Sequence, residues 1–108
     1  MEQRQGHVMN LRATRGGVPE GGVRIDRKTP WGNPFPMRNH SEAERTRVIT
    51  EHRAWLWQEI EAGRIALADL AALAGKDLWC WCAPLGCHGD TLREAALWAQ
   101  EKLREEGQ

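Results

Sequence analysis

Residues 78–90 read LWCWCAPLGCHGD, and this stretch decides how the fold is interpreted. It holds all three cysteines, one of the four histidines and two of the six tryptophans of the chain. The apolar run within 77–82 is typical of a central strand covered on both faces, and Asp90-Thr91 is expected to open a helix, with Asp90 as its N-cap. We therefore predict thiols, an imidazole and a carboxylate at a strand-to-helix junction, where α/β folds bind ligands.

Two further strands are expected upstream of this stretch. Residues 7–12 and 23–27 alternate apolar and polar side chains, as half-buried strands do. The segment 14–22 between them is rich in glycine and predicts a loop. Three prolines within 29–36 exclude regular structure there and predict an ordered, turn-rich loop.

Helices are expected in the middle and at the end of the chain. Ser41 and Glu44 fit a capping box at the start of a helix that Gly63 can end. The apolar spacing over 65–73 predicts a second, short helix, and a third follows Asp90. This order of elements predicts the α/β class, with a short, mostly parallel sheet flanked by helices in a Rossmann-like arrangement.

The length of 108 residues fits one domain, which we expect over 7–105 after a disordered N-terminus over 1–6. No apolar run is long enough to span a membrane and no secretory leader is visible, so a cytoplasmic location is expected. Three cysteines cannot all pair within one chain. In a reducing compartment, clustered thiols indicate metal ligands or reactive groups.

Charge is unevenly distributed along the chain. Residues 1–40 carry seven basic and three acidic side chains, whereas 41–108 carry eight basic and twelve acidic ones. A basic half beside a thiol cluster favours an anionic partner, such as a nucleotide or a nucleic acid. The alternative is that acidic helices simply solvate one side of the domain.

Three interpretations of the cysteine cluster stay open. Zinc prefers thiolate and imidazole ligands, and four such ligands are present: Cys80, Cys82, Cys87 and His88. Residues two apart on a strand point the same way, so Cys80 and Cys82 can share an ion, but adjacent residues such as Cys87 and His88 rarely do. Zinc is the cofactor that this set would take.

The second interpretation is a reactive, ligand-contacting site. Cys87 lies beside a helix N-terminus, which favours anions and lowers the pKa of a thiol. His88 can act as acid or base, so Cys87, His88 and Asp90 are the candidate catalytic residues. The third interpretation is structural: Cys80 and Cys82 are small core residues and Asp90 is only a helix cap.

Several motifs together resemble the DUF4326 family: WGNPF over 31–35, GKDLxCWCxP over 75–84 and CHGD over 87–90. The resemblance covers about 7–99. It implies a small domain found in bacteria, archaea and phages, of a function that is not established. Residues 24–27 read RIDR where the family usually has YIGR, so an acid replaces a glycine. The layout of strand and Cys-His pair is also similar to the DUF488 family, whose Rossmann-like fold makes a nucleotide-like ligand plausible.

The WGNPF loop supplies the remaining candidate ligand-binding groups. Trp31 can stack on a nucleobase, Asn33 can bond to the base edge, and Arg27 can meet phosphate. Alternatively, Trp31 only anchors the loop and Asn33 caps a turn. The predicted ligand-binding set is Arg27, Trp31, Gly32, Asn33, Cys82 and Gly89.

We therefore expect a nucleotide or nucleotide-derived ligand between the 31–35 loop and the 82–90 turn, with hydrolase or transferase chemistry if the domain is an enzyme. The alternatives are a structural zinc module for protein interaction and a nucleic-acid-binding module; a homo-oligomer is a further partner to consider. His52 is expected to be a hydrogen-bonded core histidine. Trp57 and Trp98 are expected either to extend the core or to mark a partner surface.

Overall fold

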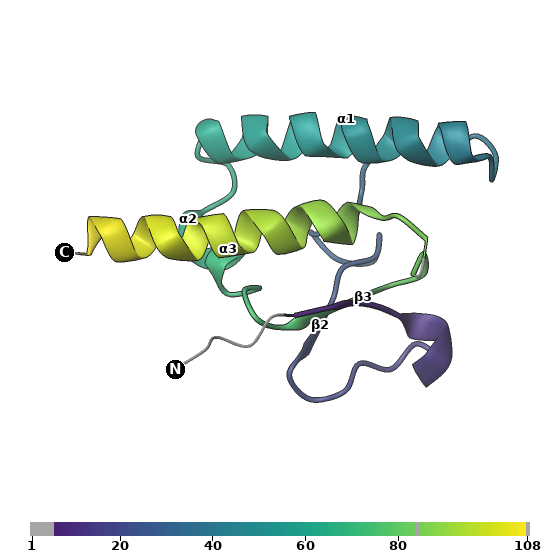
Figure 1. The fold of residues 1–108 in the computed structure, drawn as a ribbon, viewed down its shortest axis with the longest axis horizontal. Helices are drawn as coiled ribbons and strands as arrows, with labels where there is room; N and C mark the ends of the chain where they lie inside the picture. The colour runs from purple at the N-terminus through teal and green to yellow at the C-terminus, as the bar shows by residue number, and fades with distance from the viewer. Residues whose placement is uncertain (1–5, 84, 108) are drawn as a thin grey trace.

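Three parallel strands form the sheet of this α/β fold, in the order β1-β3-β2 (Figure 1). The strands are β1, Val8–Asn10; β2, Gly22–Arg24; and β3, Asp77–Cys80. The computed structural model describes residues 6–83 and 85–107. The α/β class with a parallel sheet is confirmed. Rossmann-like is only a loose description, because the described part of the chain gives the sheet three short strands.

The central strand β3 has neighbours on both sides, since Leu78 is the register partner of both Val8 and Val23. Its residues Leu78, Trp79 and Cys80 are buried, as expected for a strand covered on both faces. The strand ends at Cys80 and not at residue 82. The side chain of Asn10 donates to the carbonyl oxygens of Trp81 and Ala83, which turns the chain away from the sheet.

The two flanking strands are also shorter than predicted. After Asn10 the chain enters a 3-10 helix, η1 (Leu11–Thr14), because the Asn10 carboxamide oxygen accepts from the backbone N–H of Arg12 and caps that turn. Strand β2 ends at Arg24, whose guanidinium bonds to the carboxylate of Asp26 two residues later. Both ends are therefore set by local polar side chains, which alternation of hydrophobicity does not encode.

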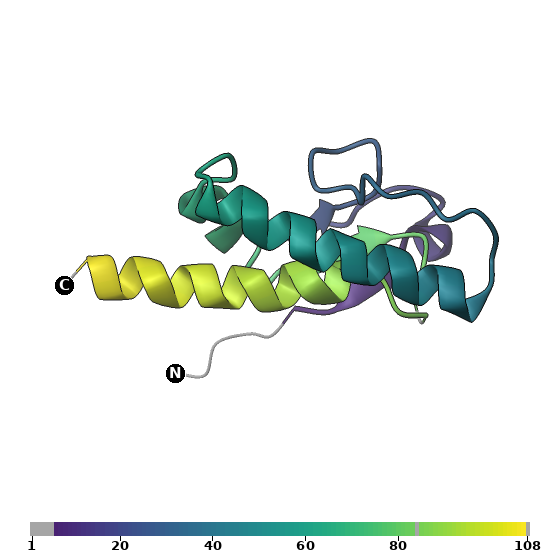
Figure 2. The same cartoon turned by 90° about the horizontal axis from the view of Figure 1, so that it is seen from above.

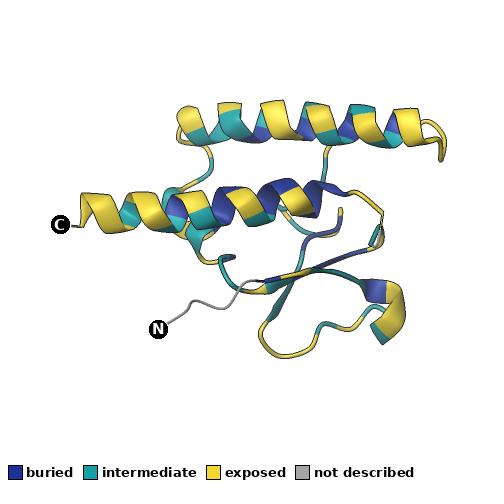
Figure 3. Ribbon diagram, viewed as in Figure 1, coloured by how far each residue is buried: buried dark blue, intermediate teal, exposed yellow. Residues whose placement is uncertain are grey.

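Three helices stack on one face of the sheet: α1 (Glu42–Glu61), α2 (Leu67–Ala71) and α3 (His88–Glu106). Helix α3 lies between α1 and the sheet, and it contacts β1, β3 and both other helices (Figures 1 and 2). The buried residues of α3 lie between His88 and Ala99, in the N-terminal part of the helix, whereas its C-terminal end is mostly exposed (Figure 3). The short helix α2 occupies only the centre of the predicted span 65–73.

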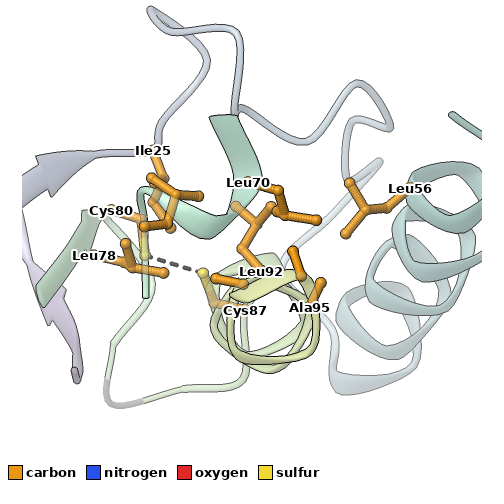
Figure 4. Close-up of a cluster of buried hydrophobic side chains, with 11 residues drawn as sticks. Ile25, Leu56, Leu70, Leu78, Cys80, Cys87, Leu92 and Ala95 are labelled. Atoms are coloured by element: carbon orange, nitrogen blue, oxygen red, sulfur yellow. Dashed lines mark hydrogen bonds between the residues drawn. The ribbon is translucent and has the colours of Figure 1, made fainter. Parts of the chain in front are cut away.

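The core joins leucines of these layers, among them Leu56, Leu70, Leu78 and Leu92, each fully buried (Figure 4). The predicted cap of α1 is confirmed, since the Ser41 hydroxyl accepts from Glu44 N–H at 3.1 Å. Burying these side chains gives the small domain a continuous apolar centre that reaches the thiols of the candidate site.

Helix α3 begins earlier than predicted, and Asp90 is not its N-cap. The N-cap is Cys87, whose Sγ accepts from Gly89 N–H at 3.2 Å. Asp90 is the third residue of the helix, and its carboxylate accepts from Cys87 N–H at 3.2 Å. The reciprocal pair is a capping box, and the prediction failed because cysteine is an unusual N-cap residue.

The N-terminal segment 1–6, which the sequence predicts to be disordered, is described by the structure only at Gly6. Residues 1–5 lie outside the described residues. Gly6 is buried, and its carbonyl accepts from the Arg93 guanidinium at 2.5 Å. Among the helices of the described residues, none has the length and apolar character that a membrane span requires.

Candidate functional site

A cavity of about 360 Å³ lies at the carboxyl end of β3. Its lining comes from three segments: the loop 26–37, the first half of α1, and the segment 80–88. Open α/β sheets bind ligands at this edge, where strand ends and helix N-termini meet. The cavity therefore occupies the position at which the sequence predicts a site.

All three cysteines line this cavity, and their sulfur atoms lie within 4.8 Å of one another. The Cys80 and Cys87 sulfurs are 3.0 Å apart, drawn as a dashed line in Figure 4. Each of these two residues is 2% exposed, whereas Cys82 is half-buried. All three are free thiols. The cavity thus reaches one accessible sulfur with two buried sulfurs behind it.

The backbone explains this convergence. Cys80 ends β3, Cys82 follows two residues later, and Cys87 is the N-cap of α3. The chain between them reverses direction, because Leu85 N–H bonds back to Cys82 C=O at 2.9 Å. A short loop therefore returns the start of the helix to the end of the strand.

The three thiols differ in acidity. Hydrogen bonds from the Cys80 and Cys87 thiols, and the nearby Arg45 guanidinium, hold the pKa of Cys82 well below its usual range. The pKa of Cys80 is raised by its hydrogen bond with Cys82, and the pKa of Cys87 is raised by its bonds to both other thiols and by burial. Cys82, and not Cys87 as its position beside the helix N-terminus predicts, is therefore the thiol whose pKa is lowered.

His88 is held by backbone on one side and by sulfur on the other. Its Nε2 lies 2.7 Å from Ile25 C=O, and its Nδ1 lies 3.4 Å from Cys87 Sγ. A carbonyl oxygen only accepts, so Nε2 carries a hydrogen and the neutral ring presents the Nδ1 lone pair to Cys87. Burial lowers the pKa of His88 despite these bonds, which keeps the ring neutral.

His52 lies behind this pair on α1. It is fully buried, and its ring contacts the ring of His88 edge-on at a centroid distance of 5.2 Å. Neither ring nitrogen has a hydrogen-bond partner among the described residues, so the expectation of a hydrogen-bonded core histidine was wrong. Burial, with a contribution from His88, lowers the pKa of His52 to about 4.

Three cationic side chains line the cavity: Arg27, Lys28 and Arg45. Arg45 extends from the first turns of α1 across to the opposite wall, where it donates to Gly86 C=O at 3.3 Å. Arg27 and Lys28 are exposed at the loop that follows β2. This arrangement favours an anionic occupant.

Asp26 and Trp81 form one edge of the cavity. The Asp26 carboxylate accepts from the Arg24 guanidinium at 2.8 and 2.9 Å and from the Trp81 indole N–H at 3.0 Å. Hydrogen bonding from Arg24, together with that from Trp81, lowers the pKa of Asp26 to about 2. The acid that replaces a glycine in the 24–27 motif therefore fixes the indole of Trp81, a residue that is 46% exposed, beside the cavity.

Four of the six predicted ligand-binding residues lie elsewhere or already have structural contacts. The Trp31 side chain packs on the core and lines a separate cavity near α2. Gly32 packs closely against the backbone of Arg27, because a Cβ at position 32 would lie 2.6 Å from Arg27 Cα. Gly89 lies at the start of α3, where a Cβ would lie 2.9 Å from the Ile25 side chain. Asn33 lines the cavity, but its carboxamide bonds to Val48 C=O and Phe35 N–H.

The other predictions divide in the same way. Arg27 and Cys82 line the cavity. Of the candidate catalytic residues, Cys87 and His88 line it, whereas Asp90 lies on a separate cavity beside Arg93. Of the candidate metal ligands, the three cysteines gather, and His88 stands outside the group of mutually close ligand atoms.

The sequence reasoning missed Arg45 and the apolar wall beside it. That wall consists of Phe35, Met37, Val48 and Ile49. A signal was present, since Arg45 precedes Val48, Ile49 and His52 at helical spacing and so lies on the buried stripe of α1. A cation on such a stripe indicates a cavity that it can reach.

One family model matches this chain: the model described as Domain of unknown function (DUF4326) matches residues 9–98. The match covers most of the 108 residues and includes every motif of the resemblance. No curated protein and no solved structure shows significant similarity.

Proposed function

The chain belongs to the DUF4326 family, and from that premise we propose that it binds a small anionic ligand, a nucleotide or a nucleotide-derived molecule, in the cavity at the carboxyl end of β3. The observation that carries the proposal is the pairing of charge and apolar surface within one cavity. Three cations and an apolar wall line it together. The cations can bind a phosphate group, and the apolar wall can pack against a base.

The size of the cavity supports a ligand of this class. Its volume of about 360 Å³ falls within the roughly 300–1,000 Å³ of small-molecule sites. The phosphate would bind Arg45, Arg27 and Lys28, which lie on opposite walls of the opening. The base would pack on the apolar wall, against Phe35 and the α1 side chains Val48 and Ile49.

The stacking residue in this proposal is Trp81 and not Trp31. Trp81 lines the cavity, and its hydrogen bond to Asp26 orients the ring. An exposed ring that is already held in one orientation can stack on a ligand with little further loss of side-chain entropy. Chemistry on the ligand, if the domain is an enzyme, would fall to Cys82, with Cys87 and His88 behind it.

Calorimetric titration with ribonucleoside mono- and diphosphates tests the proposal. Arg45→Gln is expected to weaken binding about tenfold or more, because a hydrogen bond to a charged group contributes roughly 1.5–3 kcal/mol. Arg53→Gln is the matched control, since Arg53 lies on the same helix and pairs with Glu94 outside the cavity. Absence of binding across the panel, or equal weakening by both substitutions, would show that the proposal is wrong.

A further inference from the structure

The geometry points to a binding site for a soft divalent cation such as Zn²⁺, held by the thiolates of Cys80, Cys82 and Cys87, with a fourth coordination position that opens onto the cavity. This goes beyond ligand binding by the cavity, because the metal site can be loaded and measured with no nucleotide present. A set of three thiolates binds zinc and similar soft cations in preference to harder cations.

Distances within the cluster suit tetrahedral coordination. A Zn–S bond of about 2.3 Å places two sulfurs of a tetrahedron about 3.8 Å apart. The three sulfurs lie within 4.8 Å of one another, and the Cys80–Cys87 separation is 3.0 Å. Binding therefore requires the last pair to separate by about 0.8 Å, a change that rotation about the side-chain bonds supplies without moving the backbone.

Burial and the other two thiols raise the pKa of Cys87, but the backbone around its sulfur supports a thiolate once a metal is bound. Its sulfur caps α3 and accepts the Gly89 N–H at 3.2 Å. Donor groups and the positive end of the helix dipole stabilise negative charge at this position. An N–H bond to a metal-bound sulfur also fixes its orientation, as outer partners of metal ligands do. Cysteine at a position that usually holds serine, threonine or aspartate is thereby explained.

The charges around the cluster balance the proposed complex. Three thiolates and one divalent cation carry a net charge of −1. Arg45 lies against Cys82, and Arg27 and Lys28 line the same cavity. Cys80 and Cys87 are each 2% exposed, and buried charges need such compensation. The cations thus match a thiolate–metal complex as well as an anion that approaches it.

The fourth position faces the cavity, because the described residues bring no fourth ligand atom into the cluster. The His88 Nδ1 lies 3.4 Å from Cys87 Sγ but outside the group of three mutually close sulfurs, and its Nε2 is engaged by Ile25 C=O. Cys82, by contrast, is half-buried and borders the open volume. A water molecule or an anionic ligand from the cavity would complete the tetrahedron, as in zinc sites that bind substrates.

The experiment is a titration of the reduced, full-length protein with Co²⁺ and then Zn²⁺, in a phosphine reductant and without nucleotide. We expect one ion per chain, intense visible bands of four-coordinate cobalt with thiolate ligands, and three thiols protected from titration after zinc is added. Imidazole is expected to change the cobalt spectrum by entering the fourth position. Cys82→Ser is expected to weaken affinity by more than the roughly 10- to 100-fold lost with an outer partner.

Met37→Leu is the matched control, since Met37 is the other sulfur-bearing residue on the cavity lining. It is expected to bind metal with unchanged affinity. Failure to retain an ion, or equal affinity of the Cys82→Ser variant and the native chain, would overturn the metal site. A cobalt spectrum indifferent to imidazole would overturn the open position. If the protein binds the metal but does not bind nucleotides, the metal site is supported and only the proposed function is contradicted.

Discussion

The buried imidazole of His52 should make the domain sensitive to acid in a defined pH window. The pKa of His52 is about 4 in the fold, against an ordinary value of 6.5, because burial disfavours the charged ring. The unfolded chain therefore binds a proton at a pH where the folded chain does not. The contribution of the neutral His52 ring to stability is fully present above pH 6.5 and is lost as the pH falls toward 4. At 1.36 kcal/mol per pH unit, the loss is about 3 kcal/mol.

The test is urea unfolding, followed by tryptophan fluorescence, at a series of pH values from 7 to 4. His52→Leu replaces the ring with an apolar side chain and removes both unpartnered nitrogens, so its free energy of unfolding at pH 7 should equal or exceed that of the native chain. The difference between the two proteins should then grow by about 3 kcal/mol toward pH 4.

Acid sensitivity from other titrating groups is present in both proteins, including that of His88, whose pKa burial also lowers. The pKa of Asp26 is lowered, so its contribution is lost mainly below pH 4, as protonation proceeds toward its value of about 2. That loss is common to both proteins. An identical pH dependence of stability in the native chain and the His52→Leu variant would refute the assignment of a buried, neutral His52.

Three further experiments test the structure. Gly32→Ala should lower the free energy of unfolding by about 1–3 kcal/mol, because a Cβ there would lie 2.6 Å from Arg27 Cα; Gly17→Ala, where the nearest atom is 3.4 Å away, should leave the melting temperature unchanged. Asn33→Ala should cost about 1–3 kcal/mol in urea unfolding by leaving Phe35 N–H without its acceptor, and a change near zero would contradict this. Trp57 and Trp98 meet edge-on at 4.9 Å, so a double-mutant cycle to alanine should give a coupling of about 0.5–1.5 kcal/mol, whereas full additivity would place the rings apart.

The fold class and the clustering of the cysteines could be predicted from the sequence, because both depend on strong local patterns. The apolar run of β3 identified the central strand, and the spacing of Cys80 and Cys82 placed two sulfurs on one side of the chain. Ser41 marked the start of α1. Hydrophobic period and capping chemistry act over a few residues, so a single sequence reveals them.

Contacts between distant segments could not be predicted in the same way. Trp31 was expected to stack on a ligand, but only the packing of the loop on the core shows that its side chain lies on another cavity. The short strand ends depend on side-chain bonds such as that from Asn10 to Ala83 C=O, 73 residues away. The isolation of His52 likewise depends on which groups surround it in three dimensions.

Nuclear magnetic resonance of the indole N–H groups tests most directly the central claim that the cavity at the carboxyl end of β3 is the binding site. Trp81 lines the cavity, whereas Trp57 and Trp98 pair with each other away from its lining, so one spectrum contains the probe and its controls. Titration with a ribonucleoside diphosphate is predicted to shift the Trp81 resonance saturably and to leave those of Trp57 and Trp98 in place. A Trp81 resonance that does not move, or equal movement of all three, would contradict the account.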